Sequence, residues 1–209
     1  LPVQTEMETA LAGDAVLIHP ELGDNLVFTR TADTGAVDEA FAGADHVIEA
    51  TFHTGRHTGV TLEPRSILAD YNRADGTMTV YQATQAPHMM QGVIAKQLGM
   101  NEGDVRIITR DVGGSYGIKV HVYPDEMAVA AMAKVLGRPV RFVADRFESF
   151  VSDIHARDHR ATGRIAVNTD GTIIGFDIDD LTGIGPYSVY PRTSAIEGNQ
   201  VVNLCGGPY

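Results

Sequence analysis

A strand, a glycine-rich turn and a helix follow one another directly in the middle of the chain, and this order constrains the fold more than any other feature. Residues 105–109 alternate as a strand does and lead into Gly113-Gly114-Ser115-Tyr116-Gly117. Pro124 then stands where the first turn of a helix tolerates proline, and Gly137 marks the end of that helix. The segment predicts a strand and a helix joined by a glycine turn.

Further strands are predicted where apolar and polar residues alternate between turn-forming residues. They comprise residues 15–19, 26–29, 46–57, 66–71, 77–82, 140–143, 160–167 and 173–179. The turn sequences at 72–76 and 168–171 join two pairs of these strands as hairpins. Helices interspersed irregularly among the strands favour a mixed α+β fold over a regular βαβ array.

Two other helices are expected. One covers residues 86–98 and stops at Gly99, where a left-handed residue is wanted. Its positions with core-like spacing are Met90, Val93, Ile94 and Gln97. A shorter helix starts after a cap at Asp33 or Thr34 and ends at Gly43. Its inward positions are Val37, Ala40 and Phe41.

The composition is that of an ordinary globular domain. Of 209 residues, 44% are hydrophobic and 21% are charged, which is enough apolar material for a packed core. The 27 acidic residues outnumber the 16 basic ones and give a net charge of −11, which argues against nucleic acid or membrane surfaces as partners. No apolar run approaches the roughly 20 residues that span a bilayer, and the start lacks a secretory pattern. We therefore expect a soluble, cytoplasmic protein.

Cysteine and histidine do not predict a metal centre held by side chains of this chain. Cys205 is the single cysteine, so it can form neither an internal disulfide nor a thiolate cluster, and we interpret it as a buried structural thiol. His53 and His57 would lie about 13 Å apart along a strand, too far to share one metal ion. His155 and His159 precede a predicted strand, and they lack the further convergent ligands that a metal site needs.

Adjacent acids are interpreted without catalysis. Asp125-Glu126 fits a solvated first turn of a helix, where negative charge is favourable, and Asp179-Asp180 fits a solvated strand end. We assign no nucleophile to the chain, although residues 113–117 have the Gly-x-Ser-x-Gly spacing.

The glycine segment is the most informative sign of a binding site. Successive backbone N–H groups in such a turn form a concavity suited to oxyanions or metal-oxo groups, because glycine has no Cβ to block their approach. Gly117-Ile118-Lys119 lacks the Gly-Lys-Ser/Thr order of a nucleotide-binding loop, and no Gly-x-Gly-x-x-Gly is present. Taken alone, the segment is also open to interpretation as a tight structural turn.

Three segments in order resemble the large subunit of the molybdenum hydroxylases, the family of xanthine dehydrogenase, aldehyde oxidase and aerobic carbon monoxide dehydrogenase. They are Leu62-Glu63-Pro64-Arg65, Tyr81-Gln82-Ala83-Thr84-Gln85-Ala86-Pro87 and Val112-Gly113-Gly114-Ser115-Tyr116-Gly117-Ile118-Lys119. By this resemblance, residues 35–209 are the first part of a molybdopterin-binding domain, and residues 1–34 are the tail of a preceding small α/β domain. Both termini are expected to be cuts in a longer chain.

The resemblance implies a site. Gln85 matches the family's glutamine beside the apical oxo ligand of the metal, and it is the expected catalytic residue. Gly114, Ser115, Tyr116 and Gly117 match the family's loop whose backbone N–H groups face the cofactor, with Tyr116 in place of the usual phenylalanine. Gln85 and Tyr116 would lie beside molybdenum without coordinating it directly.

The resemblance also implies a reaction and partners. The chain would be a fragment of a catalytic subunit that hydroxylates an aldehyde, an N-heteroaromatic or a similar electron-poor carbon with oxygen from water. The cofactor would be molybdopterin with molybdenum, in the plain or the cytosine dinucleotide form. Iron–sulfur clusters and FAD would lie on partner subunits or domains of a hetero-oligomer.

Two departures limit the implied activity. The family's carboxylate base lies beyond residue 209, so the isolated fragment is expected to be inactive. Lys119 is followed by Val120, where some purine-oxidising members have a glutamate, so purines are disfavoured. The alternative hypothesis is a non-catalytic α+β binding or assembly module, in which the glycine loop is only a turn.

Overall fold

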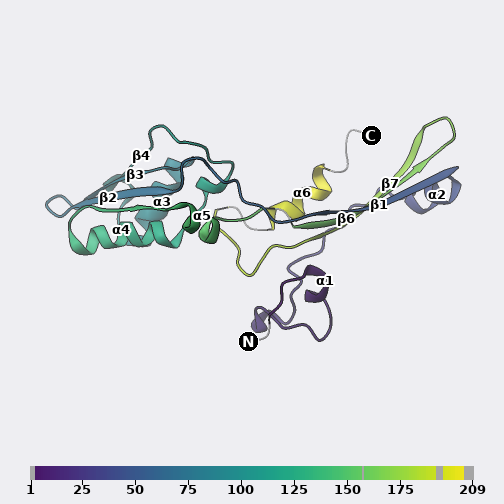
Figure 1. Cartoon of the computed structure of the whole chain (residues 1–209), viewed down its shortest axis with the longest axis horizontal. Helices are drawn as coiled ribbons and strands as arrows, with labels where there is room; N and C mark the ends of the chain where they lie inside the picture. The colour runs from purple at the N-terminus through teal and green to yellow at the C-terminus, as the bar shows by residue number, and fades with distance from the viewer. Residues whose placement is uncertain (1–2, 157, 192–194, 205–209) are drawn as a thin grey trace. The chain divides into compact units, whose positions relative to one another are not determined.

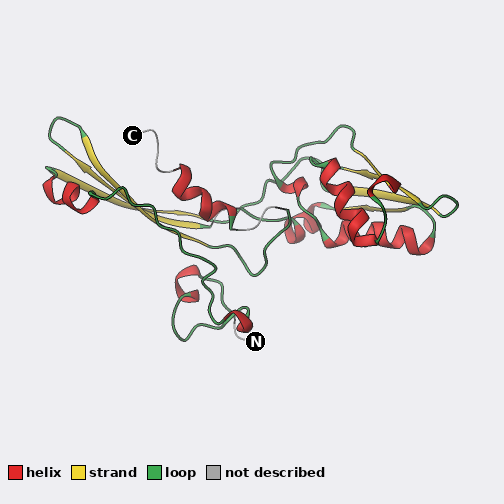
Figure 2. Ribbon diagram, turned by 180° about the vertical axis from the view of Figure 1, so that it is seen from behind, coloured by secondary structure: helices red, strands yellow, loops and turns green. Residues whose placement is uncertain are grey.

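The computed structural model describes residues 3–156, 158–191 and 195–204, and the chain divides into two compact units. We call the unit formed by residues 3–56, 158–188 and 195–204 the ribbon unit, and the unit formed by residues 57–156 and 189–191 the layered unit. Figures 1 and 2 show the elements of each. The mixed α+β class predicted from the sequence is confirmed.

The layered unit is a four-stranded sheet with helices packed on one face (Figure 2). Its strand order is β4 (Val105–Ile108), β3 (Thr77–Gln82), β2 (Ser66–Asn72) and β5 (Val140–Val143). β2 is antiparallel to both β3 and β5, whereas β3 and β4 are parallel. The helices are α3 (Pro87–Leu98), α4 (Pro124–Leu136) and the short α5 (Arg146–Ser152), with 3-10 turns at Glu102–Asp104 and Ile118–Val120.

The core of the layered unit lies between this sheet and the helices α3 and α4. Successive side chains of a strand point to opposite faces, so alternate residues of β2 and β3 are buried. The buried cluster contains Ile67, Ala69, Met78, Val80, Met90, Ile94, Ala95, Val105, Val129, Ala130 and Ala133. Within α3 the prediction of Gln97 as a core position was wrong, because that residue is exposed and Ala95 is buried instead.

Glycines end both long helices as predicted. Gly99 follows α3 with φ 60°, and Gly137 follows α4 with φ 62°. Both are left-handed conformations that glycine adopts without a Cβ clash. The helix α5 was not predicted, although Asp145 and Glu148 form a reciprocal capping box at its start.

The ribbon unit is a long antiparallel sheet of three strands. Its order is β1 (His46–Thr54), β6 (His159–Val167) and β7 (Ile173–Thr182). The helix α2 (Val37–Gly43) packs on it, and α6 (Ile196–Leu204) contacts β7. The predicted helix and its end at Gly43 are confirmed, but the side-chain cap is not: Ala36 is the cap residue, and Asp33 Oδ1 instead accepts from the Gly35 N–H over 2.8 Å.

The first 30 residues do not contain the two predicted strands, 15–19 and 26–29. Its described part, residues 3–30, has only the short helix α1 (Met7–Ala10) and a 3-10 turn at Pro20–Leu22. The side chain of Asn25 accepts from the Ile18 N–H over 2.9 Å and donates to the carbonyl oxygens of Val16 and Ala10, both over 3.0 Å. A polar side chain thus takes hydrogen bonds that a neighbouring strand would have made.

Two other expectations concern the chain as a whole. No helix among the described residues is both long enough and apolar enough to cross a bilayer. Cys205, predicted as a buried thiol, lies outside the described residues.

Candidate functional site

The two segments predicted to form the site leave the sheet at the same edge. β3 and β4 are parallel neighbours, with Tyr81 opposite Ile108, and the carboxyl ends of parallel strands meet at one edge of a sheet. β3 continues into Thr84-Gln85, and β4 continues into the loop 113–117. Side chains 30 residues apart in the sequence are thereby brought into contact.

Gln85 is held by its backbone and by its side-chain oxygen. Its N–H donates to the carbonyl oxygen of Lys119 over 3.1 Å, and Thr84 Oγ1 donates to the same oxygen over 2.9 Å. Ser115 Oγ donates to Gln85 Oε1 and accepts from the Lys119 N–H over 3.1 Å. Within the described residues, Gln85 Nε2 donates to no partner. The exposed side chain therefore presents a free amide donor.

The glycine loop presents three further donors beside Gln85. The N–H groups of Ser115, Tyr116 and Gly117 have no hydrogen-bond partner in the part of the chain that the structure describes. Gly114, Tyr116 and Gly117 have left-handed backbones, with φ of 95°, 51° and 90°. Unpartnered N–H groups on consecutive residues of a turn make a concavity suited to an oxyanion.

Tyr116 is the strained member of this loop. A non-glycine residue in the left-handed region costs about 1–2 kcal/mol, and Tyr116 is 79% exposed in the chain by itself. The strain is therefore not offset by burial of the ring within the chain. Observed strain of this kind is concentrated at functional sites.

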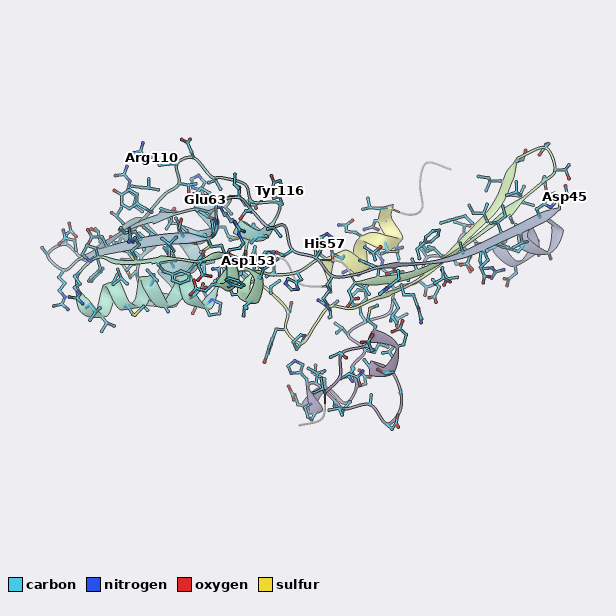
Figure 3. All side chains as sticks on the ribbon, viewed as in Figure 1. Asp45, His57, Glu63, Arg110, Tyr116 and Asp153 are labelled. Atoms are coloured by element: carbon cyan, nitrogen blue, oxygen red, sulfur yellow. The ribbon has the colours of Figure 1, made fainter. Side chains whose placement is uncertain are left out.

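An ion pair between the buried Lys119 and the partly exposed Glu63 lies next to the loop. Lys119 Nζ contacts Glu63 Oε2 over 2.7 Å, and the same oxygen accepts from the Gly113 N–H over 2.8 Å. Burial pushes the pKa of Glu63 upward, but the Lys119 ammonium and the Gly113 N–H outweigh it and hold that pKa below its usual value. Glu63 and Tyr116 are labelled in Figure 3, at the same edge of the layered unit.

A second buried cation, Arg65, is surrounded by carboxylates. Its guanidinium makes a two-pronged contact with Asp125, at 2.7 and 2.8 Å, and its Nε donates to Asp153 Oδ1 over 2.7 Å. Nη1 lies 3.3 Å from Glu126 Oε1, and the guanidinium carbon lies 3.7 Å from the centre of the Tyr123 ring. The arginine side chain is fully buried. The cluster joins the segment before β2 to α4 and to the end of α5.

Glu126 is the least solvated carboxylate of this cluster. Burial raises its pKa to about 7, although Arg65 acts in the opposite direction. Its Oε2 accepts from Gln82 Nε2 over 2.6 Å, and among the described residues Gln82 Oε1 has no partner. Gln82 ends β3, so the cluster reaches the strand that leads to Gln85.

The interpretation of the paired acids as solvated was therefore wrong for Glu126 and Asp180. Asp125 and Glu126 do lie in the first turn of α4, but both bind Arg65, and Glu126 is buried. In the ribbon unit, Asp180 lies 3.0 Å from His159 Nδ1 with its side chain only 8% exposed, whereas Asp179 is exposed. A local pattern of acids does not reveal a distant cation, which is why both pairs looked solvated.

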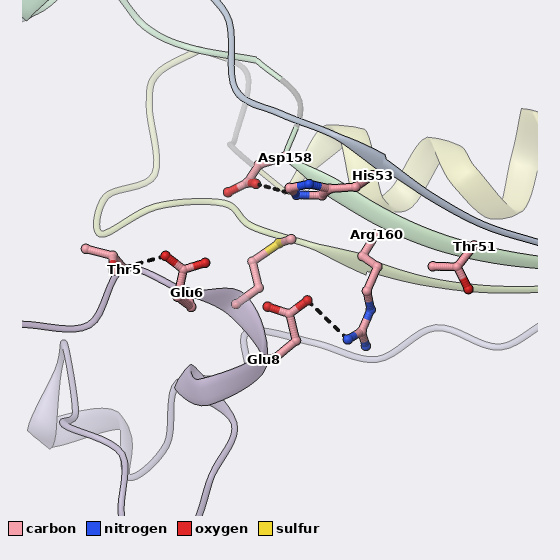
Figure 4. Close-up of a pocket in the computed structure, with 8 residues that line it drawn as sticks. Thr5, Glu6, Glu8, Thr51, His53, Asp158 and Arg160 are labelled. Atoms are coloured by element: carbon pink, nitrogen blue, oxygen red, sulfur yellow. Dashed lines mark hydrogen bonds and ion pairs between the residues drawn. The ribbon is translucent and has the colours of Figure 1, made fainter.

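The ribbon unit contains a polar hollow of about 230 Å³ (Figure 4). Arg160 contacts Glu8 over 3.1 Å, and His53 lies 3.7 Å from Asp158. Glu8 and Asp158 in this hollow thus already face basic side chains, whereas Glu6 accepts a hydrogen bond from Thr5. No group of three or more histidine, cysteine or acidic side chains suited to holding a metal ion occurs among the described residues.

A second hollow, of about 270 Å³, lies on the layered unit. Leu68, Tyr81 and Arg141 are neighbours across β2, β3 and β5 on the sheet face opposite the buried core, and all three line the hollow. Arg110, labelled in Figure 3, lines it from the segment after β4, and Glu63 also belongs to its lining. The hollow therefore adjoins the loop but does not include Gln85.

Comparison with known proteins identifies the family. The model of the molybdopterin cofactor-binding domain matches residues 18–209. The chain is 36% identical over 177 residues to the nicotine 6-hydroxylase large subunit of Paenarthrobacter nicotinovorans, across 85% of this chain and 22% of that protein. It is 30% identical to the carbon monoxide dehydrogenase large chain of Hydrogenophaga pseudoflava, across 100% of this chain and 28% of that protein.

A solved structure agrees with these sequence matches. Quinoline 2-oxidoreductase from Pseudomonas putida 86 superposes with a TM-score of 0.88 and 31% identity, over 97% of this chain and 26% of that one. The chain thus belongs to the molybdopterin cofactor-binding domain family of molybdenum oxidoreductases. It spans between 22% and 28% of the length of the relatives named above.

Sequence reasoning named Gln85 and the four loop residues, and the structure brings them together. It assigned no role to Thr84, Glu63 or Lys119. These residues contact one another, and their hydrogen bonds fix the backbone of Gln85 and the start of the loop. The signal was present, because all three stand inside the segments that carry the family resemblance.

Proposed function

We propose that the chain is part of the catalytic subunit of a molybdenum-dependent hydroxylase. Residues 35–209 would form the first part of its molybdopterin-binding domain, and residues 1–34 the tail of the domain before it. The observation that carries the proposal is the contact between Ser115 and Gln85, which places the free Gln85 Nε2 beside three free loop N–H groups. Four donors that meet no acceptor among the described residues suit a ligand rich in oxygen.

The chemistry of this donor set fits the cofactor. Oxo groups on molybdenum and the phosphate and pterin oxygens of molybdopterin are acceptors, whereas Gln85 Nε2 and the backbone N–H groups of Ser115, Tyr116 and Gly117 are donors. When bound, the cofactor supplies the two-electron oxidation of the substrate carbon. Gln85 would orient and hydrogen-bond an oxygen at the metal, and the loop N–H groups would stabilise negative charge on oxygen atoms that face them. Gly114 provides the left-handed turn that this arrangement needs.

The substrate proposed is an N-heteroaromatic or a comparable electron-poor carbon, which receives oxygen from water. Relatives named for nicotine and quinoline support this class. An aldehyde fits the same chemistry, and a purine is disfavoured because Val120 follows Lys119. The non-catalytic module has no observation in its favour.

The proposed partners follow from the names of the relatives. Some of them are named as the large chain or the gamma subunit of a complex, which supports a hetero-oligomer with iron–sulfur and FAD subunits. The proposed cofactor form is molybdopterin, plain or as the cytosine dinucleotide. The carboxylate base would come from residues beyond this chain.

Gln85→Glu, made in the complete subunit within its complex, tests the proposal. Glutamate keeps the length of the side chain and an oxygen for Ser115 but removes the amide donor, so turnover should fall by about 100-fold or more. Gln85→Ala should lose both contacts and at least as much activity. Molybdenum and pterin should be stoichiometric in the native protein, as measured by metal analysis and cofactor extraction.

Asp177→Asn is the matched control, because Asp177 faces Arg164 at a partly exposed position of the ribbon unit. It should leave turnover and metal content unchanged. The proposal fails if the native complex, expressed with ample molybdate, contains no molybdenum, or if Gln85→Glu turns over at the native rate.

A further inference from the structure

Lys119 is where the segments of the candidate site meet. Its carbonyl oxygen accepts from both the Gln85 N–H and Thr84 Oγ1, and its N–H donates to Ser115 Oγ. Ser115 in turn donates to the Gln85 side chain. One residue therefore fixes the backbone of Gln85 and, through Ser115, the orientation of its amide.

The side chain of Lys119 extends the same connection to the other side of the loop. It is completely buried, and Glu63 is its acidic partner, at 2.7 Å. A buried ammonium is costly unless an anion and hydrogen bonds compensate it. The position of Glu63 is thus tied to the position of Lys119.

Glu63 holds the start of the glycine loop in two ways. Its side chain accepts from the Gly113 N–H over 2.8 Å, and its own N–H donates to the Gly113 carbonyl over 3.1 Å. The approach is so close that a Cβ on Gly113 would lie 2.5 Å from the Glu63 Cβ. Any movement of Glu63 must therefore move the first residue of the loop.

We propose that the Glu63–Lys119 ion pair is a positioning pair, which holds the loop N–H groups and the Gln85 amide in the arrangement that faces the cofactor. The inference rests on the proposed function. Neither side chain is assigned contact with the cofactor or the substrate. The Arg65 cluster already links the surrounding helices, whereas the bonds of this pair go to the loop, so its loss should disturb the loop more than the sheet.

Lys119→Met and Glu63→Gln, each made in the complete subunit within its complex, test the pair. Methionine fills the buried volume without charge, and glutamine keeps an acceptor for Gly113. We expect backbone amide exchange in residues 113–117 to rise by about tenfold or more, with β2 and β3 protected as in the native protein. The turnover number should fall by about 30-fold while KM changes by less than about threefold, because neither side chain is assigned contact with the substrate. The paramagnetic signal of molybdenum should also shift.

The double variant Lys119→Met/Glu63→Gln sharpens the test. If the two residues act as one unit, the double variant should be no worse than the poorer single variant. Additive losses would overturn the idea of a pair. Unchanged exchange in the loop of Lys119→Met would overturn it as well, as would equal increases in the loop and in β2 and β3, which would mark a purely structural role.

The failure of this inference is distinguishable from the failure of the proposed function. Absence of molybdenum from the native complex would refute the function. The exchange comparison needs no cofactor, so it would still decide whether the pair positions the loop. Asp177→Asn again serves as the control and should leave loop exchange, turnover and the metal signal as in the native protein.

Discussion

The layered unit buries two cations in different ways. Arg65 is enclosed by Asp125, Glu126 and Asp153 and stacks on an aromatic ring, so its charge is more than compensated. Among the described residues Lys119 pairs with one carboxylate, Glu63, and its backbone follows a loop in which the N–H groups of residues 115–117 have no partner. In the first arrangement the charges face one another, as is expected of a cluster with a structural role. The second leaves donors directed away from the protein core, as a binding site requires.

Arg65→Met should lower the free energy of unfolding more than any other change proposed for these two cations. Removing the cation leaves three carboxylates close together, two of them buried, and loss of one partner from a buried ion pair costs about 3–5 kcal/mol. Urea unfolding of the chain at neutral pH should show this loss in the layered unit. A change below about 1 kcal/mol would mean that the carboxylates are solvated after all.

The pH dependence of stability should be the next largest effect. The pKa of Glu126 is raised to about 7 from an ordinary value of 4.5, so the folded chain holds the proton more tightly than the unfolded chain. Its contribution is fully present below the ordinary value and is lost as the pH rises through about 7, roughly 3 kcal/mol in all.

Glu126→Gln checks the origin of this dependence. The variant cannot ionise, and its amide can donate to the Gln82 carbonyl oxygen if that side chain turns over. Unfolding curves from about pH 5 to about pH 8.5 should therefore be flatter for the variant than for the native chain. Parallel curves would show that another group is responsible.

Gly113→Ala should have a smaller effect on stability, confined to the glycine loop and the Glu63–Lys119 ion pair. The new Cβ would lie 2.5 Å from the Glu63 Cβ, so one of the two backbones must move, at a cost of about 1–3 kcal/mol. Thermal unfolding gives the cost, and amide exchange shows where the shift occurs. Gly103→Ala is the control, since a Cβ there meets nothing within 4 Å. Equal behaviour of the two variants would contradict the close approach.

Much of the layered unit was predictable because its signals are local. The alternation in β2 and β3, the turn between them and the helix stops at Gly99 and Gly137 all depend on neighbouring residues. The predicted strands near Asn25 failed because a strand needs a partner, and local alternation does not show whether one is present.

In the candidate site, too, local features could be predicted and contacts between distant residues could not. Gln85 and the loop were found through a resemblance in local motifs. Their contact was not, since it depends on two strands that are separated in the sequence and parallel in the sheet. The charges around Arg65 were missed for a related reason: the guanidinium and its three acids come from three separate places in the chain.

The parallel pairing of β3 and β4 also determines where the unit tolerates change. The turn at residues 72–76 and the connection at residues 99–104 precede these strands, so they lie at the sheet edge opposite Gln85 and the glycine loop. Exposed residues at that edge, such as Ala74 and Gly103, are natural attachment points for a fluorophore or an affinity peptide. A label placed there would report on folding of the unit while leaving the chemistry at the opposite edge unobstructed.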